Sequence, residues 1–156
     1  MRTTAATRVR HLVLHRVDVR QDDRGMQPDF SVAVGAGTLR GSVRADAAFP
    51  HRWTDEGVAA EVQFTGAHLL HVSVAACVLN DLYREAARLG VHLDGVRVTA
   101  DGGFDTDTWR STGIAYDVTI ESNADEEAVW DLVRVVDQVA EIPRALRAGA
   151  TVRHAG

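Results

Sequence analysis

The chain contains one cysteine, Cys77, and the residues around it determine what this thiol could do. The segment has a helical pattern, in which residues three and four apart share a face. Cys77 shares a polar stripe with Ser73, Asn80, Asp81 and, one turn further, Arg84. Polar groups are costly to bury unless they are hydrogen-bonded. We therefore expect this stripe to line a pocket, a wet interface or a hydrogen-bond network.

Two roles for Cys77 stay open on this evidence. Free cysteine is among the most buried residue types, so Cys77 could simply be packed. A reactive cysteine instead needs its thiolate, which a nearby cation favours and a nearby carboxylate disfavours, so Asp81 argues against an activated thiol. Cys77 also lies about three turns from the expected helix start, beyond the reach of the helix dipole. Activation would require an arginine from elsewhere in the fold.

Other groupings give weaker signals. His68 and His71 are spaced i and i+3, which could suit a metal, but no third ligand is suggested by spacing. Packing or solvent exposure is the preferred reading of this pair. The chain also has no Gly-x-Ser-x-Gly elbow and no glycine-rich phosphate loop. The sequence therefore predicts no metal and no cofactor.

Length and composition indicate one globular domain over residues 1–156, with residues 1–7 disordered. The chain is 46% hydrophobic and 25% charged, with 17 basic residues, all arginine, against 22 acidic ones. Because the arginines alternate with acids instead of forming a stripe, binding to nucleic acid is disfavoured. No apolar run is long enough to span a membrane and no signal core follows the N-terminus, so a cytoplasmic location is expected.

The first part of the chain has the pattern of an antiparallel meander. Period-two alternation predicts strands at residues 9–19, 30–34 and 39–43, separated by turns at 21–25 and 35–37. Residues 45–64 are expected to form a loop with one short strand near 59–62.

The second part predicts two long helices and a hairpin. Thr65 can cap a helix that ends at Gly90. Between residues 69 and 79 apolar side chains surround the axis of this helix, which predicts packing across a sheet and against a second subunit. Strands near 96–100 and 114–120 form the hairpin. Residues 122–125 start a helix that runs to Pro143, before a helical turn at 144–148 and a closing strand at 151–153. The order β-β-β-α-β-β-α-β predicts an α+β fold with helices packed on antiparallel sheet.

Several of these stretches resemble the OsmC/Ohr family of osmotically inducible and organic-hydroperoxide-resistance proteins. They are the helix from Leu69 to Cys77, the connection from Glu85 to Val96, the pair Gly113-Ile114, and the segment from Ile142 to Gly149. The likeness covers residues 66–153. It implies an intertwined homodimer with active sites at the subunit interface, and a peroxidatic thiol at the position of Cys77.

The chain departs from the family pattern at two positions. In peroxidatic members of the family a second cysteine resolves the oxidised thiol, and Ala140 stands at that position here. A glutamate ten residues before the reactive cysteine is replaced by Ala67. The activating arginine of the family comes from the first hairpin, where Arg24 or Arg20 could correspond.

The sequence leaves two main functions open, and does not decide whether the protein is an enzyme. One is a degenerate OsmC-like homodimer related to thiol-dependent hydroperoxide reduction, with Cys77 as a one-cysteine thiol peroxidase that needs an external thiol. The other is a non-catalytic homodimer that holds a small apolar metabolite in an interface pocket. Ser73, Asn80, Asp81 and Arg24 are the expected pocket or supporting residues. A purely structural partner protein is a third reading.

Overall fold

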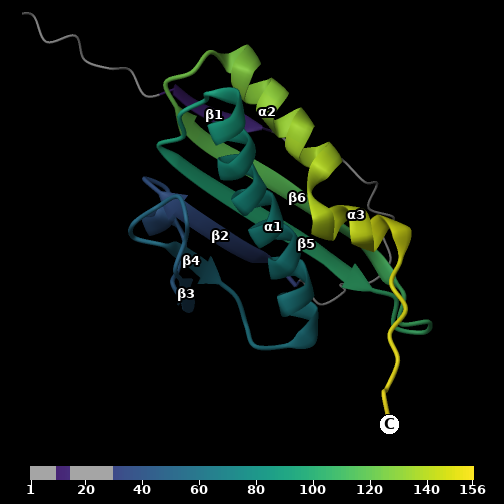
Figure 1. Cartoon of the computed structure of the whole chain (residues 1–156). Helices are drawn as coiled ribbons and strands as arrows, with labels where there is room; N and C mark the ends of the chain where they lie inside the picture. Colours follow the sequence, from purple (N-terminus) through teal and green to yellow (C-terminus); the bar gives the residue numbers. More distant parts are fainter. Residues whose placement is uncertain (1–9, 15–29) are drawn as a thin grey trace, which may run out of the picture.

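A computed structural model describes residues 10–14 and 30–156, and its centre is one six-stranded antiparallel sheet (Figure 1). The strands are β1 (Arg10–Leu14), β2 (Val32–Gly37), β3 (Ala47–Phe49), β4 (Val58–Glu61), β5 (Gly95–Phe104) and β6 (Ser111–Ser122), arranged in the order β1-β6-β5-β2-β4-β3. The helices are α1 (Gly66–Leu89), α2 (Glu126–Val139) and α3 (Glu141–Ala148), with a 3-10 turn η1 (Arg40–Ser42). The predicted α+β class, with antiparallel strands packed on two long helices, is confirmed.

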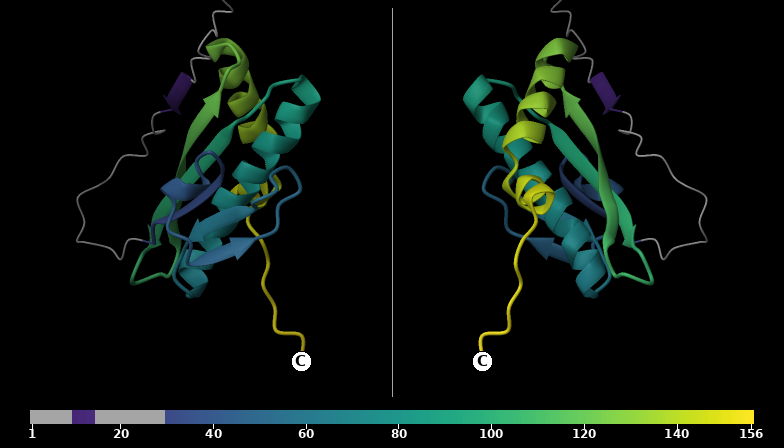
Figure 2. Two further views of the ribbon diagram at one scale, coloured as in Figure 1. Left: turned by 90° about the vertical axis from the view of Figure 1, so that its left-hand side faces the viewer. Right: turned by 90° about the vertical axis from the view of Figure 1, so that its right-hand side faces the viewer.

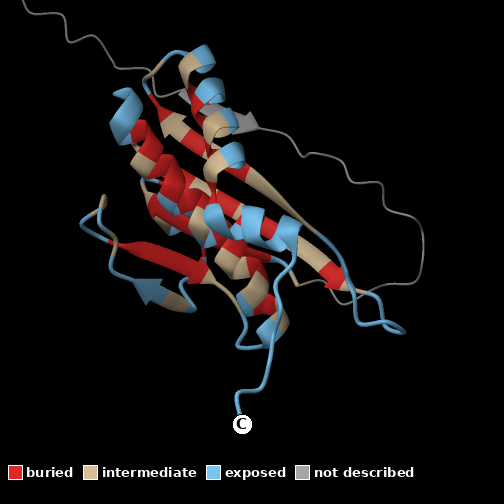
Figure 3. Ribbon diagram, turned by 45° about the vertical axis from the view of Figure 1, so that its right-hand side comes forward, coloured by how far each residue is buried: buried red, intermediate tan, exposed pale blue. Residues whose placement is uncertain are grey.

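The helices lie on the same side of the sheet, and the core forms between them (Figures 2 and 3). Alternate residues of the central strands face the helices, as the two-residue period of a strand requires. The largest buried side chains of this core are Val34, Val96, Val98 and Ile120 from the sheet, Val78, Leu79 and Leu82 from α1, and Leu132 and Val136 from α2. Cys77 therefore lies on a helix that packs against the sheet.

Both predicted ends of α1 are confirmed. The Thr65 hydroxyl oxygen accepts a hydrogen bond from the His68 amide at 3.2 Å, and Gly90 takes the left-handed conformation with φ of 71°. The helix is not enclosed on all sides within one chain, because Leu69 is 39% exposed and Ala76 and Asn80 are also exposed. One face of α1 thus remains uncovered.

The predicted strand at 39–43 and the predicted turn at 35–37 are both wrong. Gly35 lies inside β2, and residues 40–42 form η1. The reason is a close approach: a Cβ on Gly35 would lie 2.8 Å from the Leu39 carbonyl oxygen and 2.9 Å from a methyl of Val43. Glycine lets this turn fold back over the strand and bury Leu39 and Val43, which the alternating pattern had suggested were strand residues.

We expect Gly37→Ala to lower the free energy of unfolding by about 2 kcal/mol or more. Gly37 has φ of 59°, and a Cβ there would lie 2.2 Å from the Asp94 carbonyl oxygen. Gly41→Ala is the matched control, because a Cβ at Gly41 would meet no atom within 4 Å. Urea unfolding followed by circular dichroism compares the two variants, and equal stability of both would contradict this role for Gly37.

The remaining differences lie in short segments. Residues 45–64 hold two strands instead of one, since β3 is a three-residue strand at the sheet edge with too few residues to show a pattern. The helix predicted to reach Pro143 ends at Val139, and Pro143 lies in the first turn of α3, where its missing N–H is not needed.

The closing strand predicted at 151–153 is also wrong. This end of the chain runs away from the sheet (Figure 1) and Val152 is 92% exposed, so it has no strand to pair with among the described residues. Of the first predicted strand, residues 10–14 are β1, and its other residues lie outside the described part of the chain. The turn predicted at 21–25 lies outside it as well.

Candidate functional site

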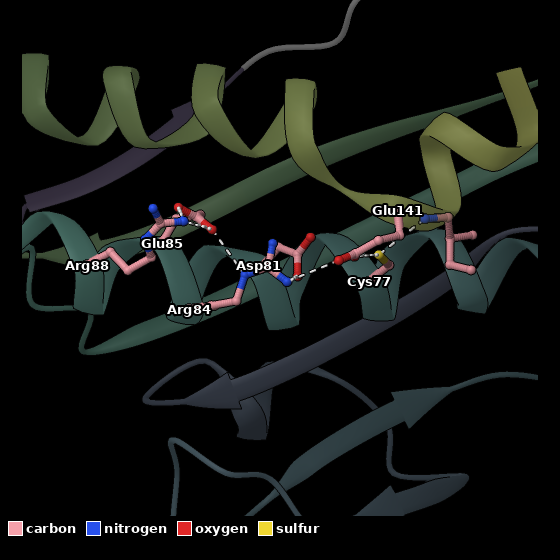
Figure 4. Close-up of polar contacts among 7 residues, drawn as sticks. Cys77, Asp81, Arg84, Glu85, Arg88 and Glu141 are labelled. Carbon is pink, nitrogen blue, oxygen red and sulfur yellow. Dashed lines mark hydrogen bonds and ion pairs between the residues drawn. The ribbon is translucent and has the colours of Figure 1, made fainter. Parts of the chain in front are cut away.

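Cys77 lies on α1 where the first turn of α3 passes over it (Figure 4). Its side chain is partly buried. The thiol donates a hydrogen bond to Glu141 Oε2 at 3.6 Å, and its sulfur accepts one from the Ile142 amide at 3.5 Å. The lone thiol is thus held between a carboxylate and a backbone N–H that belong to the same turn.

A network of charged side chains continues from Glu141 along α1. Arg84 Nη1 lies 2.8 Å from Asp81 Oδ1 and 3.3 Å from Glu141 Oε1, while Arg84 Nε lies 3.0 Å from Glu85 Oε1. Arg88 also pairs with Glu85 at 3.2 Å. The Asp81 side chain is only 1% exposed, so Arg84 joins a buried carboxylate of α1 to an exposed one of α3.

The surroundings of Cys77 favour the protonated thiol. Burial is the largest cause that raises its pKa, and the negative charges of Asp81 and Glu141 raise it further. The hydrogen bond from the Ile142 amide acts in the opposite direction but does not outweigh them. Burial also raises the pKa of Asp81 against the opposing effect of Arg84, whereas the backbone N–H and Arg84 lower that of Glu141. The arrangement supports the expectation that Asp81 disfavours an activated thiolate.

The predicted polar stripe is only partly assembled around the thiol. Asp81 and Arg84 join the Cys77 network, and the exposed Asn80 reaches it through a hydrogen bond to Asp81. The Ser73 hydroxyl instead donates to the Leu70 carbonyl of its own helix at 2.6 Å. Arg24 and Arg20 lie outside the described residues.

Sequence reasoning missed Glu141, which is 64 residues from Cys77. The one available signal was the position assigned to the resolving cysteine, Ala140, which directly precedes Glu141 and is fully buried.

The pair His68 and His71 serves packing and capping. His71 is fully buried, its Nδ1 donates to the Ala67 carbonyl at 2.7 Å, and its ring lies against Phe30 and Phe104. His68 Nδ1 instead lies 2.7 Å from the Thr65 hydroxyl at the helix start. The two imidazoles therefore have separate partners.

A cavity of about 180 Å³ lies away from α1. Its lining comes from β2, β4 and β5 and the residue before β2: Ser31, Val32, Ala33, Glu61, Arg97, Thr99, Ala100 and Asp101. It does not include the residues that were expected to form a pocket with Cys77.

The family model of OsmC-like proteins matches residues 59–155, and the chain therefore belongs to the OsmC-like family. No curated protein matches the chain significantly. Among solved structures, an OsmC-like hydroperoxide resistance protein from Jannaschia sp. CCS1 is 16% identical, with a TM-score of 0.47, over 81% of this chain and 91% of that one. Within the described residues, no helix is long and apolar enough to cross a membrane.

Proposed function

We propose that this OsmC-like chain takes part in thiol-dependent reduction of organic hydroperoxides, with Cys77 as its only reacting thiol. Membership of the family supports a peroxide-related role. The observation that carries the proposal is the position of Cys77, partly buried on α1 with its sulfur facing the Ile142 amide in the first turn of α3. A backbone N–H donated to sulfur stabilises negative charge on it, as the reaction requires.

The proposed reaction begins when the Cys77 thiol loses its proton to Glu141 Oε2, the acceptor of its hydrogen bond. The sulfur attacks the terminal oxygen of the hydroperoxide, the O–O bond breaks, and the leaving alkoxide takes the proton from Glu141 to become an alcohol. Cys77 is then a sulfenic acid. An external thiol forms a mixed disulfide with it and releases water, and a second external thiol restores Cys77 and leaves as a disulfide.

We propose further that this activity is degenerate. The chain has no second cysteine to resolve the sulfenic acid, and Ala67 replaces the family's glutamate. The raised pKa of Cys77 leaves little thiolate at neutral pH, so attack on the peroxide is slow and rises with pH. A reducing compartment would supply the external thiol, so we place the reaction in the cytoplasm.

Cumene hydroperoxide tests this function. We expect the reduced protein to lose its single free thiol and consume about one equivalent of peroxide per chain, and to turn over repeatedly only with added thiol. Free thiol and peroxide are followed together, with Cys77→Ser as the variant expected to consume no peroxide above the buffer rate. If neither thiol nor peroxide decreases in the unmodified protein, the proposed activity is excluded.

A second candidate is a non-catalytic homodimer that binds a small apolar or hydroperoxide ligand at the subunit interface. Its support is the uncovered face of α1, where the apolar side chains of Leu69 and Ala76 are exposed. The raised pKa of Cys77 also suits a site that holds a ligand without reacting with it. If the protein only binds its ligand, Cys77→Ser should keep any ligand-induced thermal stabilisation. Complete loss of that stabilisation in the variant would count against this candidate.

The proposed dimer makes a separate prediction. Ala76→Glu places a charge in the middle of the uncovered face, so we expect it to shift a dimer to monomer, because burying an unpaired charge is costly. Gln138→Glu, at an exposed position of α2, adds the same charge elsewhere and should leave the dimer intact. Light scattering coupled to size-exclusion chromatography measures the mass. A monomeric unmodified protein would refute the proposed dimer.

A further inference from the structure

Three side chains with metal-binding atoms meet where α3 crosses α1. The Cys77 sulfur and carboxylate oxygens of Asp81 and Glu141 all lie within 4.8 Å of one another. Cys77 and Asp81 are four residues apart on α1 and therefore share a face, and Glu141 is the first residue of α3. Figure 4 shows the Glu141 side chain reaching from α3 toward both of them. Thiolate sulfur and carboxylate oxygen are both ligand types that bind Zn²⁺ and similar transition metals.

One oxygen of this group has no hydrogen-bond donor in the described part of the chain, although the Asp81 carboxylate is partnered by Arg84 and Asn80. The Asp81 side chain is 1% exposed, yet its Oδ2 accepts no hydrogen bond from the described residues. A buried carboxylate oxygen without a donor is costly, and structures rarely leave one without an unseen water or ion. Asp81 is also one of the three residues whose ligand atoms lie within 4.8 Å of one another. A cation bound there would satisfy it.

Arg84 bridges the two carboxylates and so fixes their orientation. It binds Asp81 Oδ1 and Glu141 Oε1, which leaves Asp81 Oδ2 and Glu141 Oε2 free of the guanidinium. Metal-binding carboxylates are generally held in this way by a second hydrogen-bonding group. With Cys77 as a thiolate, the three ligands carry three negative charges and Arg84 one positive charge. The net charge of minus two matches a divalent cation.

One of the three ligand spacings also matches tetrahedral coordination. Zn–S and Zn–O bonds of about 2.3 Å and about 2.0 Å place sulfur and oxygen about 3.5 Å apart in a tetrahedral site. Cys77 Sγ lies 3.6 Å from Glu141 Oε2. From this geometry we propose that Cys77, Asp81 and Glu141 bind a divalent transition metal ion such as Zn²⁺, with a fourth position open to water. On binding, the S–H bond breaks, a sulfur–metal bond forms, and the proton passes to the buffer.

Zn²⁺ titration of the reduced full-length protein, in competition with a chromophoric chelator, tests this site. We expect one Zn²⁺ per chain. Cys77→Ser should weaken binding by at least about 100-fold, and Asp81→Asn and Glu141→Gln by at least about tenfold each. Glu127→Gln, which removes an exposed carboxylate from the first turn of α2, is the matched control and should bind as the unmodified protein does. The Glu141 side chain is 66% exposed, so Glu141→Gln should fold. The test therefore stays decisive even if Asp81→Asn does not fold.

Co²⁺ supplies a second readout that does not depend on peroxide activity. A Cys77 thiolate bound to Co²⁺ gives a sulfur-to-cobalt charge-transfer absorption in the near ultraviolet, which Cys77→Ser should remove. Absence of this absorption at saturating Co²⁺, or Zn²⁺ affinity unchanged in Cys77→Ser, would overturn the site and point to weak binding by surface histidines. Neither result depends on whether Cys77 reacts with peroxide, so this site stands or falls separately from the proposed function.

Discussion

Replacing Asp81 with asparagine is expected to make Cys77 react about three- to tenfold faster with a thiol reagent at pH 7. Burial is the largest cause that raises the Cys77 pKa, and the Asp81 charge raises it further from the same helix face. The change keeps the size and shape of the side chain and removes only its charge. The thiolate fraction at neutral pH therefore increases, and this gain exceeds the small loss of nucleophilicity that accompanies a lower pKa.

The measurement is the reaction rate across the pH range, in which the midpoint gives the thiol pKa directly. For the unmodified protein the rate should be slow at pH 7 and rise through the alkaline range, with a midpoint above that of an ordinary cysteine. In the Asp81 variant the whole curve should move to lower pH. Asp55→Asn, on an exposed loop, is the matched control and should leave the curve unchanged. If both variants have the same profile as the unmodified protein, Asp81 does not influence the thiol.

Truncation of Leu82 to alanine is expected to lower the free energy of unfolding by about 3 kcal/mol. Leu82 is fully buried in the core between α1 and the sheet, so its removal costs both transfer energy and the cavity left behind. Because the same helix carries Cys77 and Asp81, the variant should also loosen the thiol site and increase access of reagents to Cys77.

Leu89→Ala is the matched control, since it removes the same atoms from the last residue of the same helix, where the side chain is 53% exposed. Its effect should stay below about 1 kcal/mol. Urea unfolding at one fixed protein concentration compares the two, because association would add to the apparent stability. A loss in Leu82→Ala as small as that in Leu89→Ala would mean that this part of the core is loosely packed.

Local chemistry explains why much of the helix–sheet framework could be predicted. A hydroxyl at Thr65 can satisfy a free amide of the first turn, and Gly90 can adopt a left-handed conformation at little cost, so the ends of α1 are encoded within a few residues. The alternation in β5 and β6 likewise reflects one buried face. The alternation at 39–43 misled because two buried residues separated by a short turn produce the same spacing as a strand.

The sequence by itself determined the family, the lone thiol and the polar residues that share its helix face, because all of these depend on residue type and near spacing. Only the tertiary structure decided that Glu141 and the Ile142 amide contact Cys77, while the Ser73 hydroxyl bonds the Leu70 carbonyl of its own helix. The physical reason is that the chain bends at the buried Ala140, so that α3 packs over α1. That contact depends on how the helices share one sheet face, which no local pattern records.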